Sequence, residues 1–214
     1  WVAAGARDEL AHEQGIAHML EHMAFKGTTK RDAQMIATEV ENVGGYMNAH
    51  TSREETAYYL RLLPEHLDLG VDILADILTN STLPEHEIER ERGVIVQEIG
   101  QSLDTPDDLV FDLFAKSCFD GHTLARPILG TVESVSGFSQ ADLRAFLSRY
   151  YGAGQMLVCA AGAITHKTLA GRIEDCLGQM ASAETAKRTP AIWQGGRHIL
   201  TRQLEQAHVI FGLP

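Results

Sequence analysis

Two histidines and a glutamate stand at a spacing that can hold a metal ion. The segment His18-Met19-Leu20-Glu21-His22 has the form H-x-x-E-H. Residues advance by about 100° along a helix, so the two histidines lie about 40° apart and one turn from each other. Both imidazoles can therefore reach one ion, with Glu21 on the neighbouring edge of that face. This is the zinc motif H-E-x-x-H in reverse order, and it predicts a carboxylate beside the water that zinc would activate.

The residues around the motif favour a metal site. The alternative is a helix with two satisfied histidines and a surface glutamate. A solvated face is not normally flanked by Ile16, Met19, Leu20 and Met23. A buried, unpaired carboxylate is also unfavourable unless it serves a metal or a water.

A catalytic zinc ion takes three protein ligands, so a third ligand must come from elsewhere in the chain. Glu98 stands out because it lies within the apolar run 94–99, where a solvated surface does not readily explain a carboxylate. Glu91 lies seven residues earlier, on nearly the same helical face. The neighbouring acidic residues lie in a charged stretch that is typical of a solvated surface: Glu85, Glu87 and Glu89.

Composition and charge narrow the class of protein. A hydrophobic fraction of 44% supports a folded core, and no apolar stretch reaches the roughly 18 residues of a membrane span. The formal net charge of −11 argues against a nucleic-acid partner and is compatible with a basic substrate. The three cysteines, Cys118, Cys159 and Cys176, show no C-x-x-C spacing and fit a reducing compartment.

The hydrophobic pattern predicts an α+β fold, an antiparallel sheet packed with helices. Strands are expected at 46–50 and 56–63 as an antiparallel pair, and also at 156–164. The start of the chain, 1–6, is typical of the end of a strand. Helices are expected at 15–24, 31–43, 64–78, from 85 past 98 with a break at Pro106, 139–151 with Ser139 as N-cap, and 166–180.

Apolar periodicity is lost between 181 and 196, which predicts a linker. The expected division is a zinc-binding catalytic domain at 1–180, the linker at 181–196, and the start of a second homologous domain at 197–214, with a strand or hairpin from 199 onward. We expect the chain to be a fragment truncated at both ends.

Three segments resemble the pitrilysin and insulinase family of zinc peptidases. They are 15–28, which contains the H-x-x-E-H motif, 44–54, and 91–98, whose Glu98 lies 76 residues after His22. Within the family, the likeness is strongest to the beta-type mitochondrial processing peptidases and their bacterial relatives, and 204–208 resembles the entry to the second domain. The resemblance implies half of a LuxS-like metallohydrolase fold.

The resemblance also implies roles for individual residues. His18, His22 and Glu98 are expected to bind one Zn²⁺ per catalytic domain, with Glu21 as the general base. Glu91 matches a second acidic position that supports the catalytic site.

Two further pairs are implied as substrate-binding residues. Asn48 and Ala49 match an edge strand that pairs with the substrate backbone. Asp108 and Asp112 match carboxylates that hold a substrate arginine, and their spacing of four places them on one helical face. The competing interpretation is a solvated acidic face.

The function expected from the resemblance is a zinc-dependent metalloendopeptidase that cleaves extended, basic peptides or presequences. The alternative is a non-catalytic scaffold or peptide-binding subunit of the same family, although a scaffold has no chemical need for all four site residues. The resemblance further implies a second homologous domain or subunit that closes the site, in a homodimer or heterodimer. It places the protein in a bacterial cytoplasm or the mitochondrial matrix, with the periplasm still open.

Overall fold

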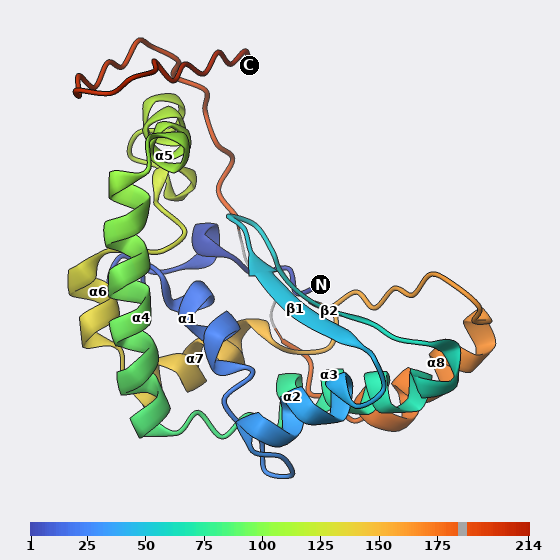
Figure 1. Ribbon diagram of the computed structural model, residues 1–214. Coiled ribbons are helices and arrows are strands. Elements are labelled where there is room, and N and C mark those ends of the chain that lie inside the picture. The colour runs from blue at the N-terminus through green and yellow to red at the C-terminus, as the bar shows by residue number, and fades with distance from the viewer. Residues whose placement is uncertain (184–187) are drawn as a thin grey trace.

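The computed structural model describes residues 1–183 and 188–214, which form helices arranged around one β-hairpin (Figure 1). The α-helices of these residues are α1 (Ile16–Met23), α2 (Ala33–Glu41), α3 (Leu67–Thr79), α4 (Glu85–Asp104), α5 (Pro106–Cys118), α6 (Val132–Gly137), α7 (Gln140–Tyr150) and α8 (His166–Leu177). Short 3-10 helices lie at η1 (Ala6–Asp8), η2 (Pro64–His66) and η3 (Thr123–Ala125).

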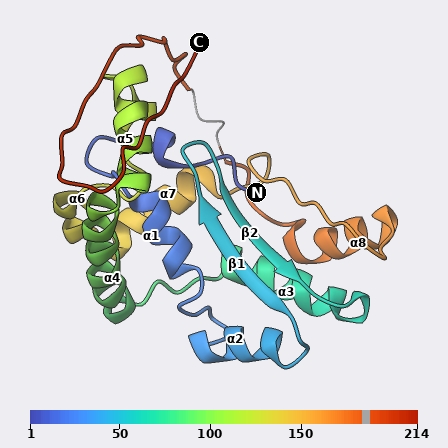
Figure 2. The ribbon, with the colours of Figure 1, turned by 45° about the horizontal axis from the view of Figure 1, so that its top comes forward.

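The hairpin consists of β1 (Tyr46–Thr51) and β2 (Thr56–Arg61), which pair antiparallel with Ala49 opposite Tyr58. Figure 2 shows the hairpin running between α1 and α4 on one side and α3 and α8 on the other. The combination of helices with a small antiparallel sheet confirms the α+β prediction.

Helix α1 lies in the core. Ile16, Met19, Leu20 and Met23 expose 2% of their surface or less, and the helix contacts α4, α7 and β1. These residues recur at the helical spacing that buries one wide face, so the opposite edge is left for the polar residues of the motif. The apolar flanks that favoured a metal site are therefore buried, as expected.

Helix α4 brings a second polar group to α1. Its buried face consists of Ile88, Glu91, Ile95 and Ile99, and it packs against α1 and α6. Pro106 then begins α5, which confirms the predicted break, because proline lacks the N–H that a continuous helix requires.

The predicted N-cap at Ser139 is confirmed. Its side chain accepts a hydrogen bond from the backbone N–H of Asp142, and the Asp142 side chain accepts one from the backbone N–H of Ser139. This reciprocal pairing satisfies N–H groups that the first turn of α7 leaves without helical partners.

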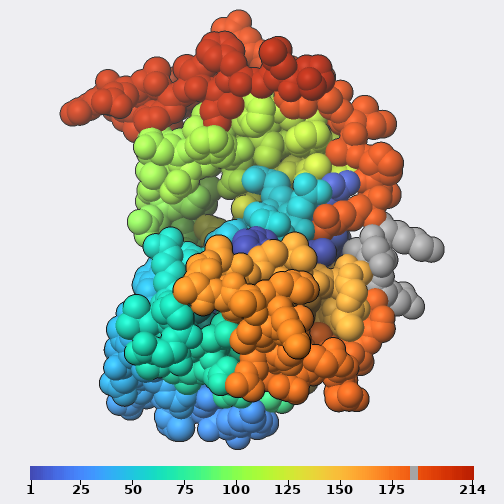
Figure 3. Space-filling model, turned by 90° about the vertical axis from the view of Figure 1, so that its right-hand side faces the viewer, coloured from blue at the N-terminus to red at the C-terminus, as the bar shows by residue number. Residues whose placement is uncertain are grey.

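The prediction of a strand at 156–164 is wrong. The segment makes only an isolated β-bridge, between Met156 and Val2. A strand needs a hydrogen-bonding neighbour along its length. Here an apolar cavity of about 630 Å³ separates the segment from β2, with Leu60, Leu74 and Ile164 among its lining residues. Residues 1–6, predicted as the end of a strand, likewise form only isolated β-bridges, from Val2 to Thr56 and to Met156. Figure 3 shows α8 and the preceding segment in orange against α3 in teal.

The strand or hairpin expected from 199 onward is also wrong, because 199–214 contains no strand. This segment lies over α5 (Figure 3) and is tied to its surroundings by single polar contacts, such as His208 Nδ1 to Asp107 at 2.8 Å. Within the predicted linker, residues 184–187 lie outside the described part, and the remaining residues form no helix or strand.

None of the helices in the described ranges, 1–183 and 188–214, is both long enough and apolar enough to cross a membrane.

Candidate metal centre

The start of α1 is fixed by a buried carboxyl group. Glu9 is 3% exposed and accepts hydrogen bonds from the backbone N–H groups of Gly15, at 3.0 Å, and Ala17, at 3.1 Å. Gly15 has φ of 93°, and a Cβ there would lie 2.6 Å from the carbonyl oxygen of Leu129. A glycine is therefore required at this turn, and the helix that carries His18 begins from a defined point.

Glu9 makes the stability of the fold depend on pH. Burial raises the pKa of Glu9 to about 8, although the amides of Ala17 and Gly15 oppose the rise. The folded state therefore holds a proton that the unfolded state releases near pH 4.5. Stability from this proton is fully present below the unfolded pKa and is lost as pH rises towards 8. We expect the free energy of unfolding to fall by up to about 5 kcal/mol between pH 5 and 9.

Denaturant unfolding of wild type and Glu9→Gln across this pH range measures the effect. Glutamine has no proton to lose, so the variant should show a shallower decline with pH. An equal decline in both proteins would contradict the assignment to Glu9.

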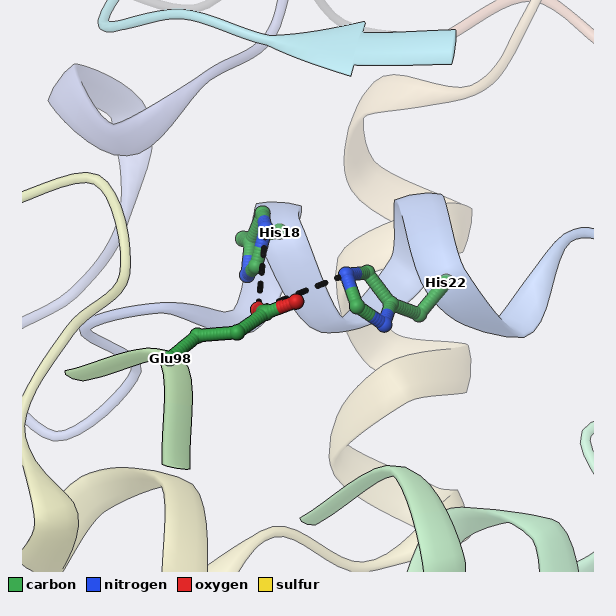
Figure 4. Close-up of side chains that lie close together, drawn as sticks. All are labelled: His18, His22 and Glu98. Atoms are coloured by element: carbon green, nitrogen blue, oxygen red, sulfur yellow. Dashed lines mark ion pairs between the residues drawn. The ribbon is translucent and has the colours of Figure 1, made fainter. Parts of the chain in front are cut away.

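The predicted ligands converge on one point between α1 and α4 (Figure 4). One potential ligand atom from each of His18, His22 and Glu98 lies within 4.8 Å of the other two. Glu98 Oε2 is 3.9 Å from His18 Nε2 and 3.7 Å from His22 Nε2. Figure 4 shows the carboxylate pointing at both rings. The structure thus brings together the two histidines and the third residue proposed from the sequence.

The positions of these three atoms suit a bound divalent cation better than direct hydrogen bonds between the side chains. Distances of 3.7 and 3.9 Å are too long for hydrogen bonds, and the buried Glu98 Oε2 has no hydrogen-bond partner among the described residues. Ligand atoms around a tetrahedral zinc ion lie roughly 3.4 Å apart, since each bond is about 2.0–2.1 Å long. A small contraction of the three side chains would therefore suit zinc.

The protonation state of His18 also fits a ligand. Burial, followed by the nearby charge of His22, lowers the pKa of His18 to about 4. The imidazole is therefore neutral at pH 7, which is the form that binds a metal.

Glu91 orients the second histidine. Its side chain is 5% exposed, and its Oε2 lies 2.8 Å from His22 Nδ1 while its Oε1 lies 2.7 Å from Lys26 Nζ. Burial disfavours its charged form, but hydrogen bonds from Lys26 and His22 outweigh burial and hold the pKa of Glu91 below its usual value. An ionised Glu91 accepts a hydrogen bond from Nδ1–H, so His22 presents the unprotonated Nε2 to Glu98 and to the metal position.

We expect Glu91→Gln to weaken zinc binding by about 10–100-fold, because loss of a hydrogen-bond partner of a metal-binding histidine has effects of this size. Competition with a fluorescent chelator measures the affinity. Glu87→Gln is the matched control, because Glu87 lies on the same helix and pairs with Arg90 at 3.0 Å. Equal zinc affinity in wild type and Glu91→Gln would contradict a role in orienting His22.

Glu21 lies on the neighbouring edge of α1, half-buried and outside the three-residue ligand cluster. Its charge acts on the buried Tyr58 and the half-buried Tyr151, whose hydroxyl groups lie 3.0 Å apart. Burial raises the pKa of Tyr151 to about 12, and Glu21 contributes in the same direction. Glu21 therefore stands close to the ligands and within electrostatic range of a protonated tyrosine pair.

The predicted substrate strand is β1. Asn48 is exposed, and its side-chain Oδ1 accepts a hydrogen bond of 2.8 Å from the backbone N–H of Ala49. This N–H is therefore not committed to β2. An edge N–H that is bonded only to a neighbouring side chain is a group that an added strand could use.

The two aspartates predicted to hold an arginine are both on α5 but differ in environment. Asp108 is exposed, whereas Asp112 is half-buried and already accepts a hydrogen bond of 2.9 Å from Arg53. Their joint role stays a prediction.

The sequence does not predict three contacts of this region: the ion pair of Lys26 with Glu91, the Tyr58–Tyr151 pair and the Arg53–Asp112 pair. Lys26 offered a signal, since it follows His22 by four residues. The other two pairs join residues 93 and 59 positions apart, and nothing local in the sequence marks them.

Two family models match the chain. The model described as Insulinase (Peptidase family M16) matches residues 1–132, and Peptidase M16 inactive domain matches 137–214. Among curated relatives, an uncharacterized zinc protease of Rickettsia felis is 40% identical over 97% of this chain and 50% of the relative. The beta subunit of human mitochondrial-processing peptidase is 43% identical over 79% of this chain and 35% of that protein.

Solved structures of proteases are also similar to this chain. Pitrilysin superimposes with a TM-score of 0.78 at 27% identity, over 89% of this chain and 21% of pitrilysin. A protease from Helicobacter pylori superimposes with a TM-score of 0.81 over 88% of this chain and 46% of its own, and its 24% identity supports the fold alone. The chain spans about half the length of the first curated relatives it matches.

Proposed function

Because this chain belongs to the insulinase family of peptidases, family M16, we propose that it is the zinc-binding part of a metalloendopeptidase. One observation carries the proposal. The buried Glu98 Oε2, which has no hydrogen-bond partner among the described residues, faces the Nε2 atoms of His18 and His22. A buried carboxylate oxygen in that position is unfavourable unless a cation joins it.

In this proposal His18, His22 and Glu98 hold one zinc ion and leave one position open for solvent or substrate. When bound, zinc supplies Lewis-acid chemistry, acidifying a water molecule and polarising the carbonyl of the bond to be cut. Glu91 keeps His22 in the required tautomer, and Lys26 keeps Glu91 ionised.

Glu21 is proposed as the general base. Its carboxylate accepts the proton of the attacking water and passes it to the leaving amine, a transfer that needs a base within reach of both atoms. Support comes from its place on the same helix as both histidines, one position before His22. Tyr58 and Tyr151 stay protonated beside it, so they add no competing negative charge.

The peptide is proposed to bind as an additional strand along β1, at Asn48 and Ala49. The Ala49 N–H would exchange its bond to the Asn48 side chain for a bond to a substrate carbonyl. A net charge of −11 favours basic peptides or presequences, and the acidic face of Asp108 and Asp112 is the proposed contact for their cations.

We also propose that a second homologous domain or subunit covers the site. Support comes from the match of 137–214 to the inactive-domain model and from relatives about twice as long as this chain. The division at 181–196 stays a prediction, as does a setting in a bacterial cytoplasm or a mitochondrial matrix. Free thiols at Cys118, Cys159 and Cys176 are compatible with a reducing compartment.

Hydrolysis of a basic peptide by the complete protein that carries these 214 residues tests the proposal. We expect cleavage that a zinc chelator abolishes and added zinc restores. Cleavage that resists the chelator would exclude zinc chemistry. Zinc binding without cleavage of any peptide would favour the non-catalytic scaffold instead.

A further inference from the structure

The segment 188–194 is attached to the proposed zinc-binding part of the chain at several points, beginning with Arg188. Its Nε donates to Asp8 Oδ1 at 2.9 Å and its Nη2 donates to Asp8 Oδ2 at 2.8 Å, so the two planar groups form a bidentate pair. The Asp8 side chain is 1% exposed. A carboxylate this deeply buried needs a cation or several hydrogen-bond donors, and Arg188 supplies both.

The same guanidinium group also contacts the β-hairpin. Its Nη2 donates to the backbone carbonyl oxygen of Glu54 at 2.6 Å, and Glu54 lies in the turn between β1 and β2. The carbonyl oxygen of the neighbouring Thr189 accepts a hydrogen bond of 2.5 Å from Arg7 Nη2. Arg7 Nη1 in turn pairs with the Glu54 side chain at 2.5 Å. Residues 188 and 189 are therefore held jointly by the N-terminal segment and by the hairpin.

Further along the segment, Trp193 makes a second attachment. Its ring lies 6.1 Å from that of Phe114 and 5.9 Å from that of Phe119, between centroids, at interplanar angles of 61° and 87°. Edge-to-face contacts of this kind stabilise aromatic rings in a defined orientation. The backbone N–H of Gln194 then donates to the carbonyl oxygen of Cys118, the last residue of α5, at 3.0 Å. The segment is thus fastened to the end of α5 as well.

Attachment at both ends distinguishes this segment from a flexible tether. Ordering a chain costs conformational entropy at every residue, so a segment that serves only as a tether gains nothing from buried ion pairs or stacked rings. The segment 199–214, by comparison, is bound through single polar contacts, such as that of Arg202 Nη1 with the carbonyl oxygen of Leu103 at 2.6 Å. Figure 1 shows the chain, in orange-red, passing the upper end of the hairpin and then rising beside α5.

We propose that residues 188–194 form a fixed strap, which is docked through Arg188 and Trp193 as one unit and holds the second homologous domain in a set orientation. The proposal rests on the proposed function, because that function includes the second domain. The strap also links the second domain to the site: Arg188 binds the turn of the hairpin, and β1 of this hairpin is the proposed substrate strand. Arg188 and Trp193 are therefore positioning residues.

Limited proteolysis of the complete protein with chymotrypsin tests whether the strap acts as one unit. Chymotrypsin cuts after aromatic residues, and mass spectrometry identifies cleavage after Trp193, in the strap, and after Tyr58, in the buried core. We expect Arg188→Gln to raise the rate of cleavage after Trp193 about tenfold, because this rate follows the population of the released segment. The rate of cleavage after Tyr58 should stay within about twofold of wild type, because release of the strap is local.

Further variants define the anchor and the control. Asp8→Asn and the double variant with Arg188→Gln should each match Arg188→Gln alone, since all three remove the same interaction. Arg202→Gln makes the same chemical change in the segment that follows the strap, and it should leave cleavage after Trp193 unchanged. The strap is overturned if Arg188→Gln also leaves this cleavage unchanged, because the two attachments would then be independent. An equal rise after Trp193 and Tyr58 overturns it too, because Arg188 would then support only the fold as a whole.

Small-angle X-ray scattering of the complete protein tests the hold on the second domain. Arg188→Gln should increase the radius of gyration relative to wild type and to Arg202→Gln, because a released connection lets the two domains move apart. An unchanged radius of gyration in a variant whose strap is released would overturn the claim that the strap sets the orientation. Neither measurement needs zinc or substrate. If wild type cleaves no peptide, the proposed function fails, and proteolysis and scattering still decide the strap.

Discussion

Glu21→Gln should retain zinc and lose hydrolysis, with kcat reduced by about 10²- to 10⁴-fold, the usual contribution of a general base. Glutamine keeps the shape of the side chain but cannot accept the proton of the attacking water. The ligand atoms of His18, His22 and Glu98 are unaffected, because Glu21 stands outside their cluster.

Two measurements on the same samples separate these effects. Elemental analysis gives zinc per chain, and steady-state kinetics on a basic peptide gives kcat. Glu41→Gln is the control, because it makes the same chemical change on an exposed residue at the end of α2. Undiminished turnover in Glu21→Gln would remove Glu21 from the mechanism, and loss of zinc would show that it acts as a ligand instead.

The spacing of the motif predicted the arrangement of the histidine pair because the relevant geometry is local. Residues four apart on a helix must share a face, and the rings of His18 and His22 lie 4.6 Å apart between centroids. Buried Ile16, Met19 and Leu20 fixed which face that is. Both statements follow from helical periodicity alone.

The sequence predicts Glu98 as the third ligand for a reason that is only half right. Its side chain is 38% exposed, and Val94, at the start of the same run 94–99, is 37% exposed. The run therefore does not mark a fully buried helix face. What places Glu98 at the site is the packing of α4 against α1, two helices that lie far apart in the sequence. The resemblance to known peptidases supplied that separation, and periodicity could not.

The strand expected at 156–164 failed for a related reason. Its composition favours extended backbone, yet a strand forms only where a neighbour supplies hydrogen bonds. The position of that neighbour depends on the whole sheet. Likewise, the spacing of Asp108 and Asp112 predicts a shared helical face. It does not indicate that Asp112 already accepts a hydrogen bond from Arg53.

Glu98→Gln should abolish zinc binding at micromolar protein. The neutral amide removes the only carboxylate in the cluster of three, and so removes the charge that balances the cation beside two neutral imidazoles. The loss of affinity should exceed the roughly 10–100-fold expected when only a partner of a ligand is removed. Glu98→Gln should therefore bind zinc more weakly than Glu91→Gln, although Glu91 is the more deeply buried of the two.

Calorimetric titration with zinc measures the affinity, and thermal unfolding gives an independent check, because a ligand that binds only the folded state raises Tm with its concentration. Wild type should show this rise, and Glu98→Gln should not. Glu89→Gln, on the exposed face of α4, should behave as wild type. Wild-type affinity in Glu98→Gln would mean that the third ligand lies elsewhere. Unaltered unfolding without zinc would show that the carboxylate matters for the metal and not for the fold, as its 38% exposure predicts.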